Sequence, residues 1–298
     1  MRPRDLIELL LLAALWGASF LLMRYAAPSF GAVALVEVRV ALAAVVLLPL
    51  LFFRGGFGSL RRHAGWVATI GVLNSALPFV LLTYATLTVT AGFAAILNST
   101  TPLWTALIGF LVWRERIRAA QWLGLSLGLV GVVILVWGKV DLRPGATHFA
   151  TALAVLAALG GAMAYGLSAN LVRRYLAGVD PLVTAAGSQV SAAVALAPLA
   201  AAAVPAVAPD AAAWAAAVAL AVACTAVAYL LYFRLLAHVG AMRAASVTFL
   251  IPVFATVWGA ALLDEPITLQ MLAGGAVILA GTALALGMLA APAQAKTA

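Results

Sequence analysis

Two prolines lie in the interior of long apolar segments, at Pro102 and Pro252. A proline inside a helix removes one backbone hydrogen bond and frees the carbonyl four residues earlier, here that of Asn98 or Thr248. A freed carbonyl beside a cavity can accept a hydrogen bond from a ligand, and the interrupted helix can bend. We therefore predict hinges at Pro102 and Pro252 and ligand contacts at Asn98 and Thr248. The alternative, that proline is simply tolerated in such helices, stays open.

A second group combines aromatic rings with hydroxyls and amides inside apolar segments. Most of its members are spaced by three or four residues, which places them on one side of a helix. Rings and small dipoles with few fixed charges suit a neutral or zwitterionic amphipathic ligand. Helix packing is the competing interpretation for any single ring, and an amide can equally join two helices. The predicted ligand contacts in this group are Trp16, Ser19, Asn74, Pro78, Trp104, Tyr165, Ser168, Tyr229, Tyr232 and Trp258.

Glu37 and Arg39 are the only charged residues well inside an apolar segment. Two residues apart on a helix they point in different directions, so they form no obvious pair with each other. Ionisable groups at such depth are candidates for function, and both residues are predicted charged contacts of the ligand. A structural ion pair between Glu37 and Arg24 is an equally good explanation.

The residue types required for catalysis do not come together in this sequence. It contains no HExxH motif, no paired aspartates in apolar segments and no lysine inside one. The histidines, His63, His148 and His238, fall in loops or at helix ends, and Cys224 is the only cysteine. We therefore predict that the protein is not an enzyme and binds neither a cofactor nor a metal ion.

Composition places these residues in membrane helices. Hydrophobic residues make up 66% of the chain and charged residues 9%, whereas soluble domains carry roughly 25% charged residues. A helix needs about 20 apolar residues to cross a bilayer, and such runs recur along the sequence. We predict an all-α integral membrane protein with ten transmembrane helices. They are expected at 6–25, 33–53, 66–84, 91–112, 120–137, 149–171, 182–204, 212–233, 244–263 and 269–289.

The basic residues predict the orientation. Most of the 17 lysines and arginines fall in alternate connections between the predicted helices, and short basic connections stay in the cytoplasm. We therefore expect cytoplasmic N- and C-termini in a multi-pass protein of the inner (plasma) membrane. The formal charge of +8 would face membrane lipids. Nucleic acid is not an expected partner, because the charges are scattered over separate connections without interleaved aromatic residues.

The sequence also repeats itself. An offset of 150 residues aligns Pro102 with Pro252 and Glu115 with Glu265, without a gap. Five helices per half is an odd number, so the second half would cross the membrane inverted, as in many secondary transporters. Duplication for assembly alone is the alternative. Glu115 and Glu265 are expected to stabilise the positive ends of the helices that follow them. The predicted repeats are residues 1–140 and 149–290, followed by a disordered tail at 291–298.

Three segments resemble one known family. LLAALWGASFLLMRYAAP, TTPLWTALIGFLVWRERI and SVTFLIPVFATVWGAALLDEPI are similar to the ten-helix EamA-type transporters of the drug/metabolite transporter superfamily. The resemblance covers essentially the full chain. It implies a central cavity lined mainly by predicted helices 1, 3, 4, 6, 8 and 9, with helices 5 and 10 as peripheral scaffold. Family members export amino acids and other metabolites.

The resulting expectation is a secondary transporter. It would export small metabolites, most of all amino acids with aromatic or other apolar side chains, by alternating access around the cavity. The cavity helices lack a carboxylate at mid-depth, so we expect transport down the substrate's own gradient. A flippase of lipid-linked sugars and a non-transporting membrane scaffold are the competing interpretations. The expected partners are a small-molecule substrate and membrane lipids, and the expected state is a monomer or a weak homodimer.

Overall fold

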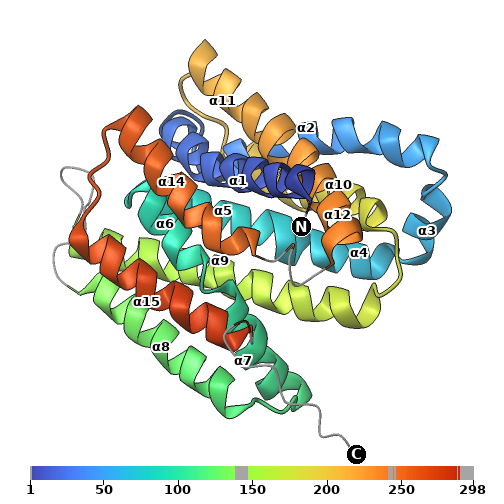
Figure 1. Cartoon of the computed structure of the whole chain (residues 1–298). Helices are drawn as coiled ribbons and strands as arrows, with labels where there is room; N and C mark the ends of the chain where they lie inside the picture. The colour runs from blue at the N-terminus through green and yellow to red at the C-terminus, as the bar shows by residue number, and fades with distance from the viewer. Residues whose placement is uncertain (1, 138–146, 241–243, 245, 287, 289–298) are drawn as a thin grey trace, which may run out of the picture.

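All secondary-structure elements in the described part of the chain are helices (Figure 1). The computed structural model describes residues 2–137, 147–240, 244, 246–286 and 288. The helices are α1 (Pro3–Phe30), α2 (Ala32–Phe53), α3 (Phe57–Arg62), α4 (Ala64–Gly71), the π-helical turn η1 (Val72–Ala76), α5 (Leu77–Thr86), α6 (Ala91–Asn98), α7 (Thr101–Trp113), α8 (Ala119–Val136), α9 (His148–Tyr175), α10 (Pro181–Ala202), α11 (Ala211–Ala221), the π-helical turn η2 (Val222–Val227), α12 (Ala228–Val239), α14 (Val247–Leu263) and α15 (Leu269–Ala285).

The prediction of an all-helical membrane protein is confirmed. By length and composition, eight helical segments in the described part of the chain are apolar and long enough to cross a bilayer. They are Pro3–Phe30, Ala32–Phe53, Ala64–Thr86, Ala91–Trp113, Ala119–Val136, His148–Tyr175, Pro181–Ala202 and Ala211–Val239. Because α14 and α15 are apolar but shorter, the count of ten spans and the orientation of the termini stay predictions. The tail predicted at 291–298 lies outside the described residues.

Two of the long segments contain a π-helical turn at matching positions of the repeat. In η1 the backbone N–H of Leu77 donates to the carbonyl of Val72, and in η2 the hydroxyl of Thr225 donates to the carbonyl of Leu220 at 2.8 Å. Such a turn holds one residue more than an α-helical turn and often occurs at functional sites. The offset of 150 residues carries the start of η1 onto the start of η2.

The two interior prolines have different local structures. Before Pro102 the helix is broken between α6 and α7, and the hydroxyl of Thr101 donates to the carbonyl of Asn98 at 2.8 Å. The carbonyl that Pro102 frees is therefore already hydrogen-bonded. Pro252, by contrast, lies inside the continuous helix α14. Only the first proline therefore interrupts its helix, and the hinges at Pro102 and Pro252 stay predictions.

Helix packing leaves α8 and α15 side by side at the edge of the bundle, while α1 packs on α14, α2 on α10 and α9 on α5 and α7 (Figure 1). Glycines allow the close approach of α8 and α15. A Cβ atom on Gly124 would lie 2.5 Å from the carbonyl oxygen of Gly281, and one on Gly281 would lie 2.6 Å from that of Gly124. The small-residue face of α8 is therefore occupied within the chain.

Replacing Gly281 with valine is expected to lower the thermal unfolding midpoint in detergent, because the added atoms overlap the α8 backbone. Overpacking of this kind costs about 1–3 kcal/mol. The matched control is Gly275→Ala in the same helix, where the new Cβ would lie 3.4 Å from Ile96 Cδ1. Equal midpoints for the two variants would contradict the role of the glycine contact.

Candidate functional site

A cavity of about 530 Å³ lies between the helices that pack around the core. The described residues that line it come from α1, α2, α4, η1, α5, α6, α7, α9, α10, η2, α12 and α14, and none of them comes from α8 or α15. The lining extends to Arg173, whose side chain is largely exposed. The described residues of the wall include no aspartate and no glutamate. The cavity is therefore a partly apolar space bounded by dipoles, aromatic rings and two arginines.

Most of the residues predicted to contact a ligand lie in this wall. They come from segments distant in sequence, and the structure brings them together around one space. The residues of the prediction that line the cavity are Trp16, Ser19, Arg39, Asn74, Asn98, Pro102, Tyr165, Ser168, Tyr229, Tyr232 and Thr248. Their role as ligand contacts stays a prediction.

Five predicted residues lie elsewhere: Pro78, Trp104, Trp258, Pro252 and Glu37 are not part of the wall. The indole N–H of Trp258 donates to the carbonyl of Ala14 at 3.2 Å, so this ring joins α14 to α1. Trp104 packs against α9 at Gly166. A Cβ atom added to Gly166 would lie only 2.9 Å from the Cβ of Trp104. These positions correct the prediction, since the rings are used between helices.

Arg39 has the most unusual environment in the cavity. Arg39 is only 4% exposed to solvent. Nε donates to the hydroxyl of Thr225 at 2.9 Å and an Nη donates to the hydroxyl of Ser19 at 3.1 Å. The other Nη lies 3.7 Å from the sulfur of Met23, and the guanidinium carbon lies 3.7 Å from the ring centre of Phe79. A charged group is thus held by neutral groups alone among the described residues.

A hydrogen-bonded cluster lies in the same cavity wall. The amide nitrogen of Asn74 donates to the hydroxyl of Tyr229 at 3.1 Å, and the hydroxyl of Ser168 donates to the amide oxygen of Asn74 at 3.4 Å. The cluster links η1, α9 and α12. Asn98 adds an amide oxygen that is buried and has no hydrogen-bond partner among the described residues. Polar groups at this depth are available to a bound molecule.

The hydrogen bond from Arg39 to Thr225 has a counterpart between two neutral residues. Gln189 is the residue that the repeat aligns with Arg39, and Ser75 aligns with Thr225. The amide nitrogen of Gln189 donates to the hydroxyl of Ser75 at 2.9 Å, the same length as the bond from Arg39 to Thr225. Both bonds join a long helix, α2 or α10, to a π-helical turn. Sequence reasoning missed this pairing, because nothing in the hydrophobic pattern announces a π-helical turn.

One end of the bundle, here called the Arg24 end, is held together by a buried ion pair. Nε of Arg24 lies 2.9 Å from a carboxylate oxygen of Glu265, and their side chains are 10% and 8% exposed. Arg24 also donates to the carbonyl of Thr86 at 2.7 Å, and Glu265 accepts from the backbone N–H of Ala91 at 2.9 Å. This pair therefore ties α1 and the end of α14 to α5 and α6. The ion pair considered between Arg24 and Glu37 is wrong.

The opposite end, the Arg173 end, carries the equivalent pair in an exposed form. Glu115 accepts hydrogen bonds from both Arg173 and Arg174, and the Glu115 side chain is 37% exposed. The hydrogen bond from Arg173 holds the pKa of Glu115 below its usual value. At the Arg24 end, Arg24 donates to the carbonyl of Thr86, whose counterpart in the repeat is Leu236. Both Arg174 and Leu236 are described, and no hydrogen bond joins Arg174 to the carbonyl of Leu236. At this end the ion pair therefore joins only the segment that follows α7 to α9.

Neither glutamate caps the helix that follows it, contrary to the prediction, although Glu265 accepts from the N–H of Ala91 in the first turn of α6. Arg114 and Asp264 have positive φ angles of 56° and 51°, which end α7 and α14 just before the glutamates. The following helices begin four residues later, and α15 is capped by the hydroxyl of Thr268. The carboxylates are consequently free to turn back toward the arginines.

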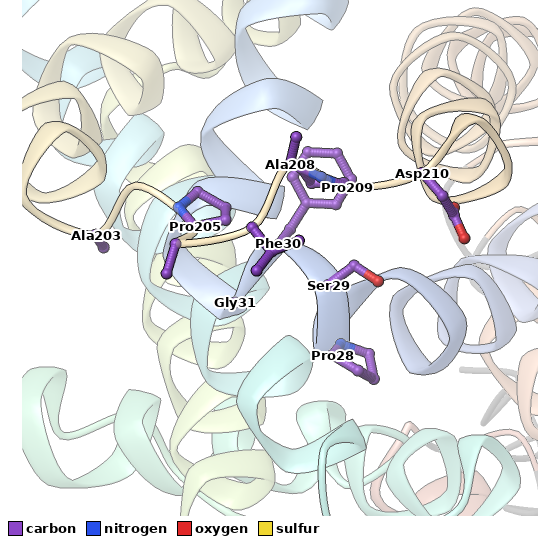
Figure 2. A pocket seen from close by; sticks show the side chains of 11 residues that line it. Pro28, Ser29, Phe30, Gly31, Ala203, Pro205, Ala208, Pro209 and Asp210 are labelled. Atoms are coloured by element: carbon purple, nitrogen blue, oxygen red, sulfur yellow. The ribbon is translucent and has the colours of Figure 1, made fainter.

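A second hollow, of about 580 Å³, lies on the surface between the α1–α2 turn and the α10–α11 connection (Figure 2). Pro28, Phe30, Pro205 and Pro209 give it an apolar character. Its one charged residue among those described, Asp210, already accepts a hydrogen bond from the N–H of Ala213 at the start of α11. One carboxylate oxygen of Asp210 is thus used to cap α11.

Comparison with known proteins links this architecture to one family. The EamA-like transporter family model matches residues 6–137 and again residues 152–287. An uncharacterized transporter of Archaeoglobus fulgidus is 22% identical over 281 residues, covering 92% of this chain and 96% of that protein. The uncharacterized inner membrane transporter YedA of Escherichia coli (strain K12) is 26% identical over 311 residues, covering 99% and 96%.

One further relative and one solved structure are similar to this chain. The protein PA1977 of Pseudomonas aeruginosa is 30% identical over 256 residues, and the match covers 84% of each chain. One solved crystal structure superposes with a TM-score of 0.65 at 21% identity, covering 96% of this chain and 97% of that one. At this identity the structural match supports the fold alone.

Proposed function

The chain belongs to the EamA-like transporter family, and within it we propose that this protein is a secondary transporter that exports small metabolites by alternating access. The observation that carries the proposal is the cavity of about 530 Å³, whose wall reaches exposed Arg173, while the buried Arg24–Glu265 pair joins the helices at the other end. The protein would lie in the inner membrane of the cell. We place its Arg173 end on the cytoplasmic side, because the basic connections between helices gather at that end. Substrate would then load from inside.

The repeat supports a mechanism of exchange between two states. Two inverted five-helix halves, residues 1–140 and 149–290, would let each end adopt the structure that the other end has here. In the outward-open state the Arg24 pair would release Thr86 and Ala91, and Arg174 would donate to the carbonyl of Leu236. Amino acids with aromatic or other apolar side chains are the first candidates for the cargo, since Trp16 and three tyrosines line the cavity.

A counterflow assay in liposomes tests transport directly. Vesicles loaded with one unlabelled amino acid or aromatic metabolite should accumulate the labelled compound in a saturable way, and protein-free vesicles should not. Flipping of a fluorescent polyprenyl phosphate without any small-molecule exchange would instead support the lipid-linked sugar flippase. Absence of both activities would support a non-transporting scaffold.

Transport is expected to be independent of a proton gradient. The described residues of the cavity wall include no carboxylate that could exchange a proton, and Glu37 lies outside it. At a fixed substrate gradient, collapsing an imposed pH gradient with an ionophore should leave the initial rate within about twofold, since coupling to one proton per cycle would change it far more. A rate that falls with the proton gradient would contradict this expectation.

A further inference from the structure

Arg39 is a buried cation without a counter-charge in the described structure. None of the described carboxylates forms an ion pair with it, and Glu37, two residues earlier, has a carboxylate oxygen that is buried without a partner of its own. Removing a charged group from water is costly unless a partner of opposite charge is present. The cavity wall therefore contains two arginines, of which Arg173 is paired with Glu115 and Arg39 has a positive charge that an anion would neutralise.

The geometry leaves room for that anion. A guanidinium carries five N–H donors in a planar fork. Thr225, Ser19 and Met23 occupy three of them, so two N–H groups are left, one on each terminal nitrogen. Phe79 covers one face of the plane. A carboxylate is the group that such a fork binds best, through two parallel hydrogen bonds.

The rest of the cavity offers nothing equivalent for an ammonium group. Among the described residues its wall has no acidic side chain, and the remaining polar groups are the hydroxyls and amides around Asn74 and Asn98. Tyr165, Tyr229 and Tyr232 provide an apolar surface next to them. A ligand that combines one carboxylate with an aromatic or apolar tail fits this distribution of charge.

Resting on the transporter function proposed above, we propose that Arg39 binds the carboxylate of the cargo and that an ammonium group on the cargo is dispensable. Organic monoanions with an aromatic tail then bind at least as tightly as the amino acids with the same tail. Amines that lack the carboxylate are excluded by the positive charge of Arg39. The specificity of the cavity therefore follows the acid group and not the α-amino group.

The chain itself provides a suitable test variant. Gln189 makes the same bond to Ser75 that Arg39 makes to Thr225, both at 2.9 Å. Glutamine is thus compatible with this helix-to-turn contact, and Arg39→Gln removes the charge while keeping a donor for Thr225. Arg39→Lys is the second variant, because lysine keeps the charge but lacks the planar fork.

The experiment compares 3-phenylpropionate, L-phenylalanine and 2-phenylethylamine, which share one aromatic tail. Binding to the purified full chain is measured by calorimetry and by ligand-induced thermal stabilisation. Both carboxylates should bind the unmodified protein, with 3-phenylpropionate at least equal to phenylalanine, and the amine should not. Arg39→Gln should weaken both carboxylates by about tenfold or more, as expected for the loss of a buried charged partner, and Arg39→Lys should be intermediate.

Arg234→Gln is the matched control, since it removes an arginine charge outside the cavity and should leave both affinities within about twofold. Gel filtration and the unfolding midpoint of the empty protein verify that each variant is folded. Equal binding of the amine, no binding of either carboxylate, or unchanged affinities in folded Arg39→Gln and Arg39→Lys would each overturn the assignment. Binding that depends on Arg39 without exchange across liposomes would instead overturn the transporter function while leaving the site.

Discussion

Replacing Glu265 with glutamine is expected to destabilise the folded protein strongly, whereas the same replacement at Glu115 should have little effect. The two residues align in the repeat, and each pairs with an arginine that also aligns. Their surroundings differ: the Arg24–Glu265 pair is about one-tenth exposed, and the Glu115 side chain is 37% exposed. Removing one partner of a buried pair costs about 3–5 kcal/mol because the other charge stays buried. An exposed pair contributes about 0–1 kcal/mol.

Unfolding of both variants in the same detergent, followed by circular dichroism at neutral pH, measures this difference. The double variant Arg24→Met with Glu265→Leu should recover part of the loss, because it leaves no buried charge unpaired. Similar midpoints for Glu265→Gln and Glu115→Gln would contradict the buried-pair interpretation. Lowering the pH adds a check at the exposed pair. Because the pKa of Glu115 is lowered in the folded state, its small contribution is present above the usual value of 4.5 and is lost as the pH falls through the lowered pKa.

Replacing Gly92 with leucine is expected to abolish transport by holding the Arg24 end open. Gly92 is the second residue of α6, after Ala91, and a Cβ there would lie 2.5 Å from the hydroxyl oxygen of Thr256 and 3.1 Å from the terminal carbon of Met271. A leucine side chain at this position therefore pushes α6 away from α14 at the Arg24 end. If the two ends alternate, the Arg173 end then closes. The transport rate should fall by at least about tenfold, which corresponds to some 1.4 kcal/mol.

Counterflow in liposomes gives the rate, and cysteine labelling gives the state. Ala169, which is exposed in the cavity wall near Arg173, is replaced with cysteine in a Cys224→Ser background. An impermeant thiol reagent added at the Arg173 end should label it readily, and the Gly92→Leu substitution should reduce that labelling. Gly65→Leu is the control, because no atom lies within 4 Å of a Cβ at Gly65. Unchanged transport and labelling in folded Gly92→Leu would rule out closure at this point.

The sequence predicted the helices and much of the cavity wall for a simple physical reason. A polar or aromatic side chain inside an apolar run must find a partner or a cavity, so Ser19, Asn74, Ser168 and Tyr229 could be selected without coordinates. Arg39 was selected on the same ground. Its partners could not be, because the hydroxyl of Thr225 comes from a residue 186 positions away.

Tertiary contacts determine the positions of the residues whose roles the sequence did not predict correctly. Trp258 resembles a cavity ring by its depth in the helix, yet its indole N–H meets a backbone carbonyl of α1. Glu115 and Glu265 resemble caps, yet the left-handed residues before them delay the next helix and direct the carboxylates to arginines. In each case the outcome depended on which neighbour was nearest, and a hydrophobic pattern contains no information about neighbours.

The π-helical turns occur in both halves of the chain. A π-helical turn arises when one residue is inserted into an α-helix, and the insertion rotates everything beyond it by about 100°. Val72–Ala76 and Val222–Val227 occupy corresponding positions in the two halves. Both turns present a hydroxyl residue, Ser75 in the first and Thr225 in the second, to the helix that packs on them. Their partners differ, since Gln189 is neutral and Arg39 is charged, so the two halves keep one backbone device and place a charge on only one of these two contacts.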